Sequence, residues 1–160
     1  MKNSMRQELT RRQALFFAVS GAAVWTVLYP ARAVLAARPE ILVYKSPECG
    51  CCGLWSTHLT ESGFAVRIVE IDDLTPVKRQ ARVPEDLETC HTAFLDGYVV
   101  EGHVPVGAID KLLNERPSVI GVAVPGMPAG APGMPGAQRE PFDVLTFAAD
   151  GRRTLFMSFR

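Results

Sequence analysis

Four cysteines are the residues of this chain best suited to chemistry. Three of them lie in the run Cys49-Gly50-Cys51-Cys52, and Cys90 follows 38 positions after Cys52. Thiolate sulfur is a soft ligand, so thiolates gathered at one point favour Cu(I), with Zn(II) second. Cys49 and Cys52 alone would form a redox pair, but a simple dithiol switch does not need Cys51 between them. Four converging sulfurs could bind one ion or bridge several.

Structural disulfides are the alternative interpretation of the same four residues. An exported chain meets an oxidising compartment, where cysteines usually pair. Four cysteines allow three connectivities. One of them joins Cys49 to Cys52 and Cys51 to Cys90, whereas a bond between the neighbours Cys51 and Cys52 would be strained. Spacing and export alone leave metal binding and disulfide bonding evenly balanced. The two can also alternate, because oxidation of the thiols would empty a metal site.

Histidine supplies a fifth candidate ligand, His103, in the segment Gly102-His103-Val104-Pro105. Its imidazole could donate a nitrogen from the rim opposite the cysteine run, although a histidine at a hairpin end is more often an ordinary surface residue. His58 lies nearly two helical turns after Cys52, and we interpret it as a packing residue. Strand side chains alternate between faces, so His91 should point away from Cys90 and is interpreted as structural.

The first elements place the cysteine run at the start of a helix. Residues 40–44 are an apolar run typical of a buried strand, residues 50–62 have helical spacing, and residues 64–71 predict a strand covered on both faces. The cysteine run therefore follows a predicted strand and lies at the start of a predicted helix. At that position the helix dipole and the free amides stabilise thiolates.

The remaining elements predict where Cys90 lies. Residues 75–82 and 84–86 have helical signals, residues 91–95 and 98–101 flank the hairpin turn Asp96-Gly97, and residues 105–115 are amphipathic. The order β-α-β-α-β-β-α is that of the α/β thioredoxin-like fold. The loop before the third strand of that fold packs against the start of the first helix, so Cys90 is expected to reach the cysteine run.

A loop and a hairpin follow this core. Residues 117–141 contain six prolines and five glycines, so no regular element is expected there. Met127 and Met134 lie in this loop within repeated Pro-Gly-Met sequences, where packing and transient copper capture are both open interpretations. Residues 142–148 and 154–159 alternate around Asp150-Gly151 and predict an added C-terminal β-hairpin. Residues 38–160 are thus expected to form one domain.

Residues 1–37 have the pattern of an export signal. Arg11-Arg12 precedes an apolar run, and small residues suitable for cleavage follow, as in a twin-arginine signal. The protein is therefore expected in the periplasm, unless the uncharged stretch 13–31 is kept as a membrane anchor. After residue 33 the chain holds 12 basic and 16 acidic residues. This balance excludes the basic surface of a nucleic-acid binder.

Several motifs together resemble a known family. The family comprises small bacterial metal-binding domains long labelled as of unknown function, and it includes the CopG-type periplasmic copper-resistance proteins. The resemblance covers about residues 40–150. The stretches that carry it are 46–55 (SPECGCCGLW), 58–59 (HL), 90–92 (CHT), 96–98 (DGY), 101–105 (EGHVP) and 123–128 (AVPGMP).

The resemblance implies a thioredoxin-like metal-binding domain with a multinuclear copper site in copper handling or resistance. Carried over residue by residue, the ligands are Cys49, Cys51, Cys52, Cys90 and His103. Two hypotheses follow. The protein either binds periplasmic copper as Cu(I), with zinc as the alternative ion, and passes it to other copper-handling proteins, or it is an oxidoreductase acting on thiols and disulfides or on copper.

Overall fold

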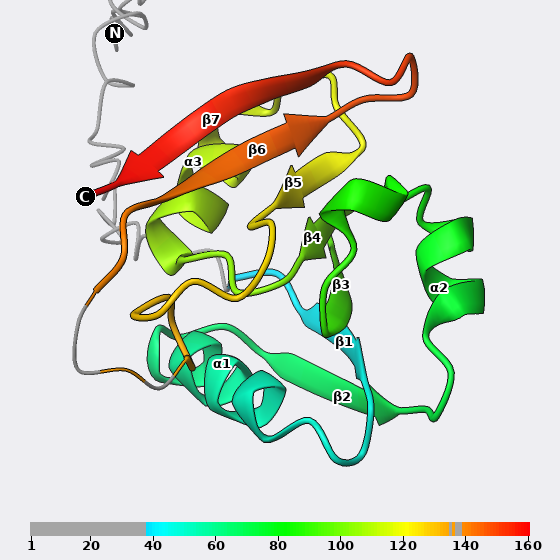
Figure 1. Ribbon diagram of the computed structural model, residues 1–160, viewed down its shortest axis with the longest axis vertical. Helices are drawn as coiled ribbons and strands as arrows, with labels where there is room; N and C mark the ends of the chain where they lie inside the picture. Colours follow the sequence, from blue (N-terminus) through cyan, green and yellow to red (C-terminus); the bar gives the residue numbers. More distant parts are fainter. Residues whose placement is uncertain (1–37, 135, 137–138) are drawn as a thin grey trace, which may run out of the picture. The chain divides into compact units, whose positions relative to one another are not determined.

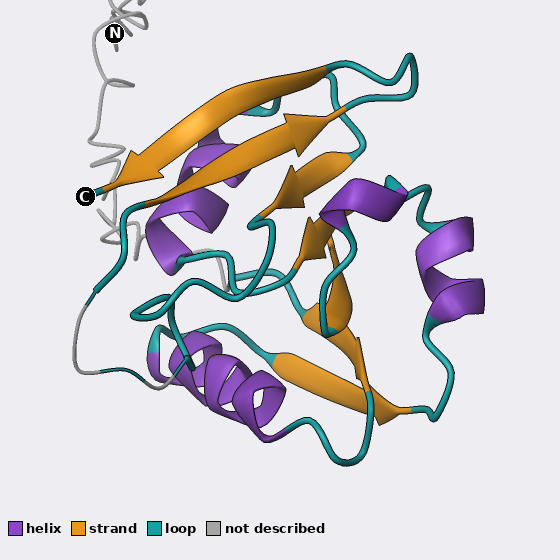
Figure 2. Ribbon diagram, viewed as in Figure 1, coloured by secondary structure: helices purple, strands orange, loops and turns teal. Residues whose placement is uncertain are grey.

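Seven strands form one mixed sheet in the computed structural model, which describes residues 38–134, 136 and 139–160 (Figures 1 and 2). The predicted export signal lies outside the described residues. The strands are β1 (Ile41–Lys45), β2 (Val66–Glu70), β3 (His91–Leu95), β4 (Tyr98–Glu101), β5 (Gly121–Ala123), β6 (Phe142–Phe147) and β7 (Arg153–Phe159). The helices are α1 (Gly50–Glu61), α2 (Thr75–Gln80) and α3 (Val106–Glu115), with a 3-10 turn η1 (Glu85–Leu87).

The strands lie in the order β2-β1-β3-β4-β5-β6-β7. β1 and β2 are parallel and are joined through α1, whereas β3 runs antiparallel to β1 and forms a hairpin with β4. The elements up to α3 therefore occur in the predicted order. The C-terminal hairpin is also confirmed, and β5 joins it to β4.

The two faces of the sheet are covered by different helices. The larger core joins Trp55 of α1 and Ile109 of α3 to Val100 of β4. The smaller core joins Leu87 of η1 to Val99 of β4. Since neighbouring residues of a strand point to opposite faces, α1 and α3 cover one face and the α2–η1 segment covers the other.

Two expectations about strands were wrong. β2 is an edge strand, and Ile68 in it is 44% exposed, so the strand is not covered on both faces. β5 lies inside the stretch where no regular element was expected. A side chain at Gly121 would place its Cβ 2.0 Å from the carbonyl oxygen of Val99, so glycine lets this short strand approach β4.

The helices of the described residues are too short or too polar to cross a membrane.

Candidate metal centre

The register of the sheet brings the two cysteine-bearing segments together. Lys45 at the end of β1 pairs with His91 at the start of β3 in the antiparallel ladder. The chain that leaves β1 therefore lies at the same end of the sheet as the chain that enters β3. Cys49 caps α1 just after β1, and Cys90 immediately precedes β3. The predicted convergence is thus a consequence of strand pairing.

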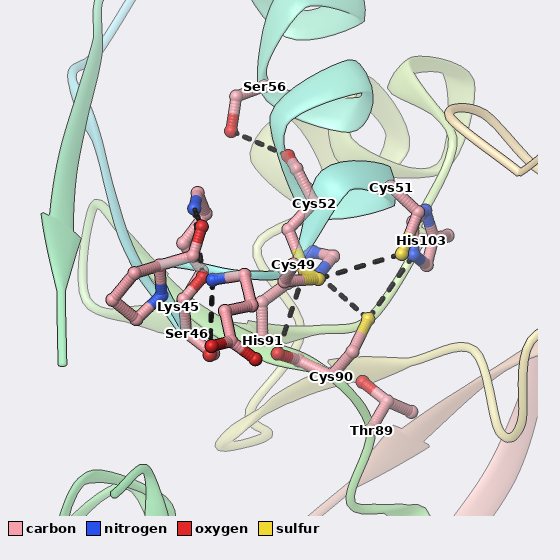
Figure 3. The surroundings of a disulfide bond; sticks show 12 residues. Lys45, Ser46, Cys49, Cys51, Cys52, Ser56, Thr89, Cys90, His91 and His103 are labelled. Carbon is pink, nitrogen blue, oxygen red and sulfur yellow. Dashed lines mark hydrogen bonds between the residues drawn. A yellow bond between two sulfur atoms is a disulfide. The ribbon is translucent and has the colours of Figure 1, made fainter. Parts of the chain in front are cut away.

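All four sulfurs meet at this end of the sheet (Figure 3). The sulfur atoms of Cys49, Cys51, Cys52 and Cys90 lie within 4.8 Å of one another. Cys49 and Cys51 are 3.6 Å apart between sulfurs, and the Cys52 sulfur lies 3.6 Å from the Cys90 carbonyl oxygen. Cys52 is fully buried, whereas the other three are partly exposed.

Cys49 and Cys52 are joined by a disulfide, while Cys51 and Cys90 are free. One bond of the alternative disulfide pairing is therefore present, and the other is not. In this oxidised form, two of the four sulfurs are not available as thiolates. Reduction by two electrons would present all four thiols at one point.

His91 belongs to the site, and the expectation that it points away from Cys90 was wrong. Its Nδ1 atom lies 3.4 Å from the Cys90 sulfur, and its ring lies against Trp55 with centroids 4.4 Å apart. Cys90 precedes β3 rather than belonging to it, so strand alternation does not relate the two side chains. Adjacency to Cys90 just before the strand was the signal available in the sequence.

Cys90, His91 and His103 form a second donor group, with ligand atoms within 4.8 Å of one another. The Nε2 atom of His103 lies 3.3 Å from the Cys90 sulfur. The Nε2 atom of His91 is buried and has no hydrogen-bond partner among the described residues. Since Cys90 belongs to both groups, its thiol links the sulfur cluster to the two imidazoles.

The proline- and glycine-rich loop fixes the tautomer of His103. The His103 Nδ1 atom lies 2.7 Å from the carbonyl oxygen of Pro132. A carbonyl only accepts, so Nδ1 carries the proton and donates. The lone pair of Nε2 then faces the Cys90 sulfur. A backbone partner on the far nitrogen is the arrangement usual for metal-binding histidines.

Burial determines the protonation states of Cys90, His91 and His103. It raises the pKa of the Cys90 thiol to about 12, and the neighbouring Cys51 adds to the shift. It lowers the pKa of His91 to about 3, helped by repulsion from His103 and Lys78. The pKa of His103 is also lowered by burial, against the opposing effect of its bond to Pro132. At neutral pH the metal-free site holds a Cys90 thiol and two neutral imidazoles, so a bound cation must displace the thiol proton.

The other residues singled out in the sequence lie around the cluster or away from it. Trp55 is fully buried beside His91, as expected of a packing residue, and its indole N–H donates to the Val104 carbonyl at 2.9 Å. His58 lies further along α1 and, together with Pro132, lines a cavity of about 470 Å³. Met127 is 58% exposed in the loop.

These features define a small α/β protein in which one end of the sheet offers four sulfurs and two imidazoles. Two solved structures, described as copper resistance protein CopG, are similar to it. Form 2 is 38% identical, with a TM-score of 0.73, and the match covers 77% of this chain and 99% of that chain. Form 1 is 39% identical, with a TM-score of 0.71, and the match covers 75% of this chain and 96% of that chain.

The family described as "protein of unknown function, DUF411" matches residues 87–134, which contain Cys90, His91 and His103. No match was found among curated proteins. The chain belongs to the DUF411/CopG-type family, which confirms the resemblance carried by its motifs.

Proposed function

We propose that this protein binds copper as Cu(I) in the periplasm and serves copper resistance or homeostasis. The observation that carries the proposal is the convergence of Cys49, Cys51, Cys52 and Cys90, with all four sulfurs within 4.8 Å of one another. Thiolate sulfur and imidazole nitrogen suit Cu(I), and Zn(II) is the competing ion. The similar structures are described as copper resistance proteins, which supports copper as the cargo.

The proposed ligands are the four cysteines and His103, and the described geometry adds His91 as a further donor. Cys90 belongs to both donor groups, and its sulfur lies near Cys51 and both imidazoles. A thiolate placed between two donor groups can bridge ions, so we propose a multinuclear site. Reduction of the Cys49–Cys52 disulfide is the step that makes all four thiolates available.

Metal stoichiometry tests this proposal. The purified protein, reduced and then exposed to Cu(I), is expected to retain copper through gel filtration, and the variant Cys51→Ser/Cys90→Ser to lose most of it. His103→Gln removes a proposed ligand nitrogen, so it should weaken Cu(I) binding at least as much as loss of a residue that only supports a ligand, about tenfold or more. His58→Gln, at a histidine outside the donor groups, should leave Cu(I) binding unchanged. Equal copper content in the wild type and the double cysteine variant would refute the proposal.

Export by the twin-arginine route belongs to the same proposal. Arg11-Arg12 before an apolar run supports it, and so does the Cys49–Cys52 disulfide, a bond typical of oxidising compartments. We expect the protein in the periplasmic fraction without its first residues, and Arg11→Lys/Arg12→Lys should leave it in the cytoplasm. Periplasmic recovery of that variant at wild-type level would contradict this route. In the periplasm, the wild-type protein would pass copper to other copper-handling proteins.

An oxidoreductase is the second candidate function, and the Cys49–Cys52 disulfide at the start of α1 favours it. When this dithiol closes to a disulfide, two electrons and two protons leave it, enough to reduce two Cu(II) ions or one substrate disulfide. Insulin reduction and stopped-flow measurement of Cu(II) reduction would test the two activities. No turnover above Cys49→Ser/Cys52→Ser in either assay would leave binding as the function.

We also assign the first part of the domain to the thioredoxin-like fold. The neighbouring strands β2-β1-β3-β4, with β1 and β2 parallel and the β3–β4 hairpin antiparallel, support this assignment. A crystal structure with β2 paired to another strand would contradict it.

A further inference from the structure

A buried ion pair lies at the sulfur-bearing end of the sheet, on the face that α2 covers. Lys78 of α2 and Glu101 of β4 are 2.5 Å apart between Nζ and Oε1, and their side chains are 6% and 0% exposed. Thr92 of β3 lies opposite Glu101 in the strand register and bonds to both charges. His91, one position before Thr92, points to the α1 face and the donor groups. The pair and the site are therefore separated by the thickness of the sheet.

The Glu101 carboxylate binds both residues that flank the segment Cys90-His91. Thr89 donates to Oε1 from its backbone N–H at 2.7 Å and from its hydroxyl at 3.1 Å. The Thr92 hydroxyl donates to Oε2 at 2.7 Å. Figure 3 shows Thr89 directly beside Cys90. One carboxylate thus fixes the chain immediately before and immediately after two donors of the site.

The same carboxylate is tied to the segment that carries His103. Glu101 ends β4 and is followed by Gly102, whose backbone N–H donates to the His91 carbonyl at 3.2 Å. The segment that bears Cys90 and the segment that bears His103 are therefore joined at Glu101. Lys78 holds this junction by donating to Glu101 and, at 3.0 Å, to the Thr92 hydroxyl.

Stability alone is a poor reason for this arrangement. The free-energy cost of removing two charges from water cancels most of the free energy gained from their attraction. Apolar residues of similar volume often stabilise a fold as well or better. What a buried, multiply bonded pair provides in exchange is one specific geometry. The geometry fixed here is that of the two segments that bring Cys90 and His103 to the sulfur cluster.

We propose that Lys78 and Glu101 are positioning residues that hold Cys90 against Cys51 and His103 from the opposite face of the sheet. The importance of this role for copper rests on the proposed function. The positional claim itself concerns the thiols alone and can be tested without metal.

The test measures how well Cys51 and Cys90 are held together. In the full chain with Cys49→Ser/Cys52→Ser, these two thiols are equilibrated with a glutathione buffer. Oxidised glutathione accepts their two electrons and two protons, which yields one Cys51–Cys90 disulfide and two reduced glutathiones. The equilibrium constant gives the effective concentration of one thiol at the other. Glu101→Asp keeps the charge but shortens the reach to Thr89 and Thr92, and we expect this value to fall about tenfold.

Three further variants separate positioning from general weakening of the fold. Lys78→Arg keeps the positive charge and should retain most of the effective concentration. Leu112→Ala, on the buried face of α3, should lower stability but leave the thiol equilibrium within about twofold of the parent. Should Glu101→Asp fail to fold, Thr92→Val replaces the hydroxyl with a methyl group of similar size and should lower the effective concentration about threefold.

The outcomes decide both proposals separately. An unchanged thiol equilibrium in Glu101→Asp, or an equal fall in Leu112→Ala, overturns the positioning role. A fall confined to Glu101→Asp and Thr92→Val supports it, whether or not copper binds. Cu(I) titration of the wild-type chain then tests the proposed function by itself. If copper binds, Glu101→Asp should also weaken Cu(I) affinity about tenfold. Wild-type Cu(I) affinity in that variant would overturn the importance of the positioning for copper, whereas the thiol equilibrium alone decides the positional claim.

Discussion

Cys49, Cys51 and Cys52 come from one turn of chain at the start of α1, whereas Cys90, His91 and His103 come from two segments that only the sheet brings together. We call the first set the helix half of the site and the second the sheet half. The helix half is closed by its own disulfide, and two of its three cysteines, Cys49 and Cys51, are partly exposed. The sheet half is more deeply buried and is held by residues distant in sequence.

The difference between the halves lies in what supports them. A single helix start fixes the helix half, so local changes should affect it alone. The sheet half depends on the buried pair of Lys78 and Glu101 and on the loop carbonyl of Pro132. Substitutions far from the sulfur atoms should therefore affect the sheet half more than the helix half. We also expect these substitutions to lower the free energy of unfolding the most.

Loss of the buried positive charge of Lys78 is expected to have the largest effect on stability. Lys78→Met leaves the Glu101 carboxylate buried without a partner, which costs about 3–5 kcal/mol of unfolding free energy. Urea denaturation of the metal-free protein measures this loss. The matched control is Arg153→Met at the surface pair with Asp86, where the loss should stay below about 1 kcal/mol. Equal losses at the two sites would show that burial of the pair is not what matters.

Acid should have the next largest effect on stability, through His91 in the sheet half. Burial lowers the pKa of His91 from 6.5 to about 3, so between these values the unfolded chain binds a proton that the folded chain does not. This contribution to the free energy of unfolding is complete above pH 6.5, declines as the pH falls, and is gone below about pH 3. The slope reaches about 1.4 kcal/mol per pH unit.

Urea denaturation of the metal-free protein at several pH values between neutrality and mild acid tests this dependence. His91→Phe keeps a buried ring but has nothing to protonate. The carboxylates and His103 are present in both proteins, so the difference between the two curves is assigned to His91. A pH slope in the variant as steep as in the wild type would mean that His91 is not the group responsible.

The contact between the proline- and glycine-rich loop and α1 should be sensitive to one methyl group. A Cβ at Gly133 would lie 2.6 Å from the Trp55 backbone nitrogen and 2.8 Å from the Cys51 carbonyl oxygen, and its φ of +82° also favours glycine. Gly133→Ala should push the loop off α1, weaken the Pro132–His103 hydrogen bond and cost about 2–3 kcal/mol.

Gly126→Ala is the matched control for this contact. Gly126 has a φ of +69° in the same loop, but a Cβ there meets no atom within 4 Å. It should therefore cost only about 1 kcal/mol and leave Cu(I) affinity unchanged. Similar losses of stability and of copper affinity in the two variants would mean that the contact with α1 is unimportant.

The sequence predicted the helix half more completely than the sheet half, for a physical reason. A cysteine run after an apolar strand and before a helical pattern is a local signal, and α1 begins at Gly50 as expected. The hairpin around Asp96-Gly97 is equally local, and both of its strands have the predicted bounds. Cys90 could be placed because strand order, once predicted, determines which chain ends meet.

What could not be predicted depended on contacts between distant residues. Strand alternation does not relate the His91 side chain to Cys90, because Cys90 lies in the loop before β3, where packing against distant residues sets the direction of a side chain. β5 exists because Gly121 allows a close approach to β4, which no periodicity reveals. The pairing of Lys78 with Glu101 joins residues 23 positions apart, and each looks like an ordinary surface charge in the sequence.

The smallest change in stability is expected in the helix half. Cys49→Ser/Cys52→Ser removes a disulfide whose cysteines are only three positions apart, so it releases little chain entropy, at most about 2 kcal/mol. Urea denaturation under oxidising conditions measures it, with Cys51→Ser as the control that keeps the bond. Adding reductant to the wild type should reproduce the loss and leave the double variant unchanged. A loss as large as that of Lys78→Met would contradict the distinction between the halves, because the sheet half would then depend on the helix half for its own stability.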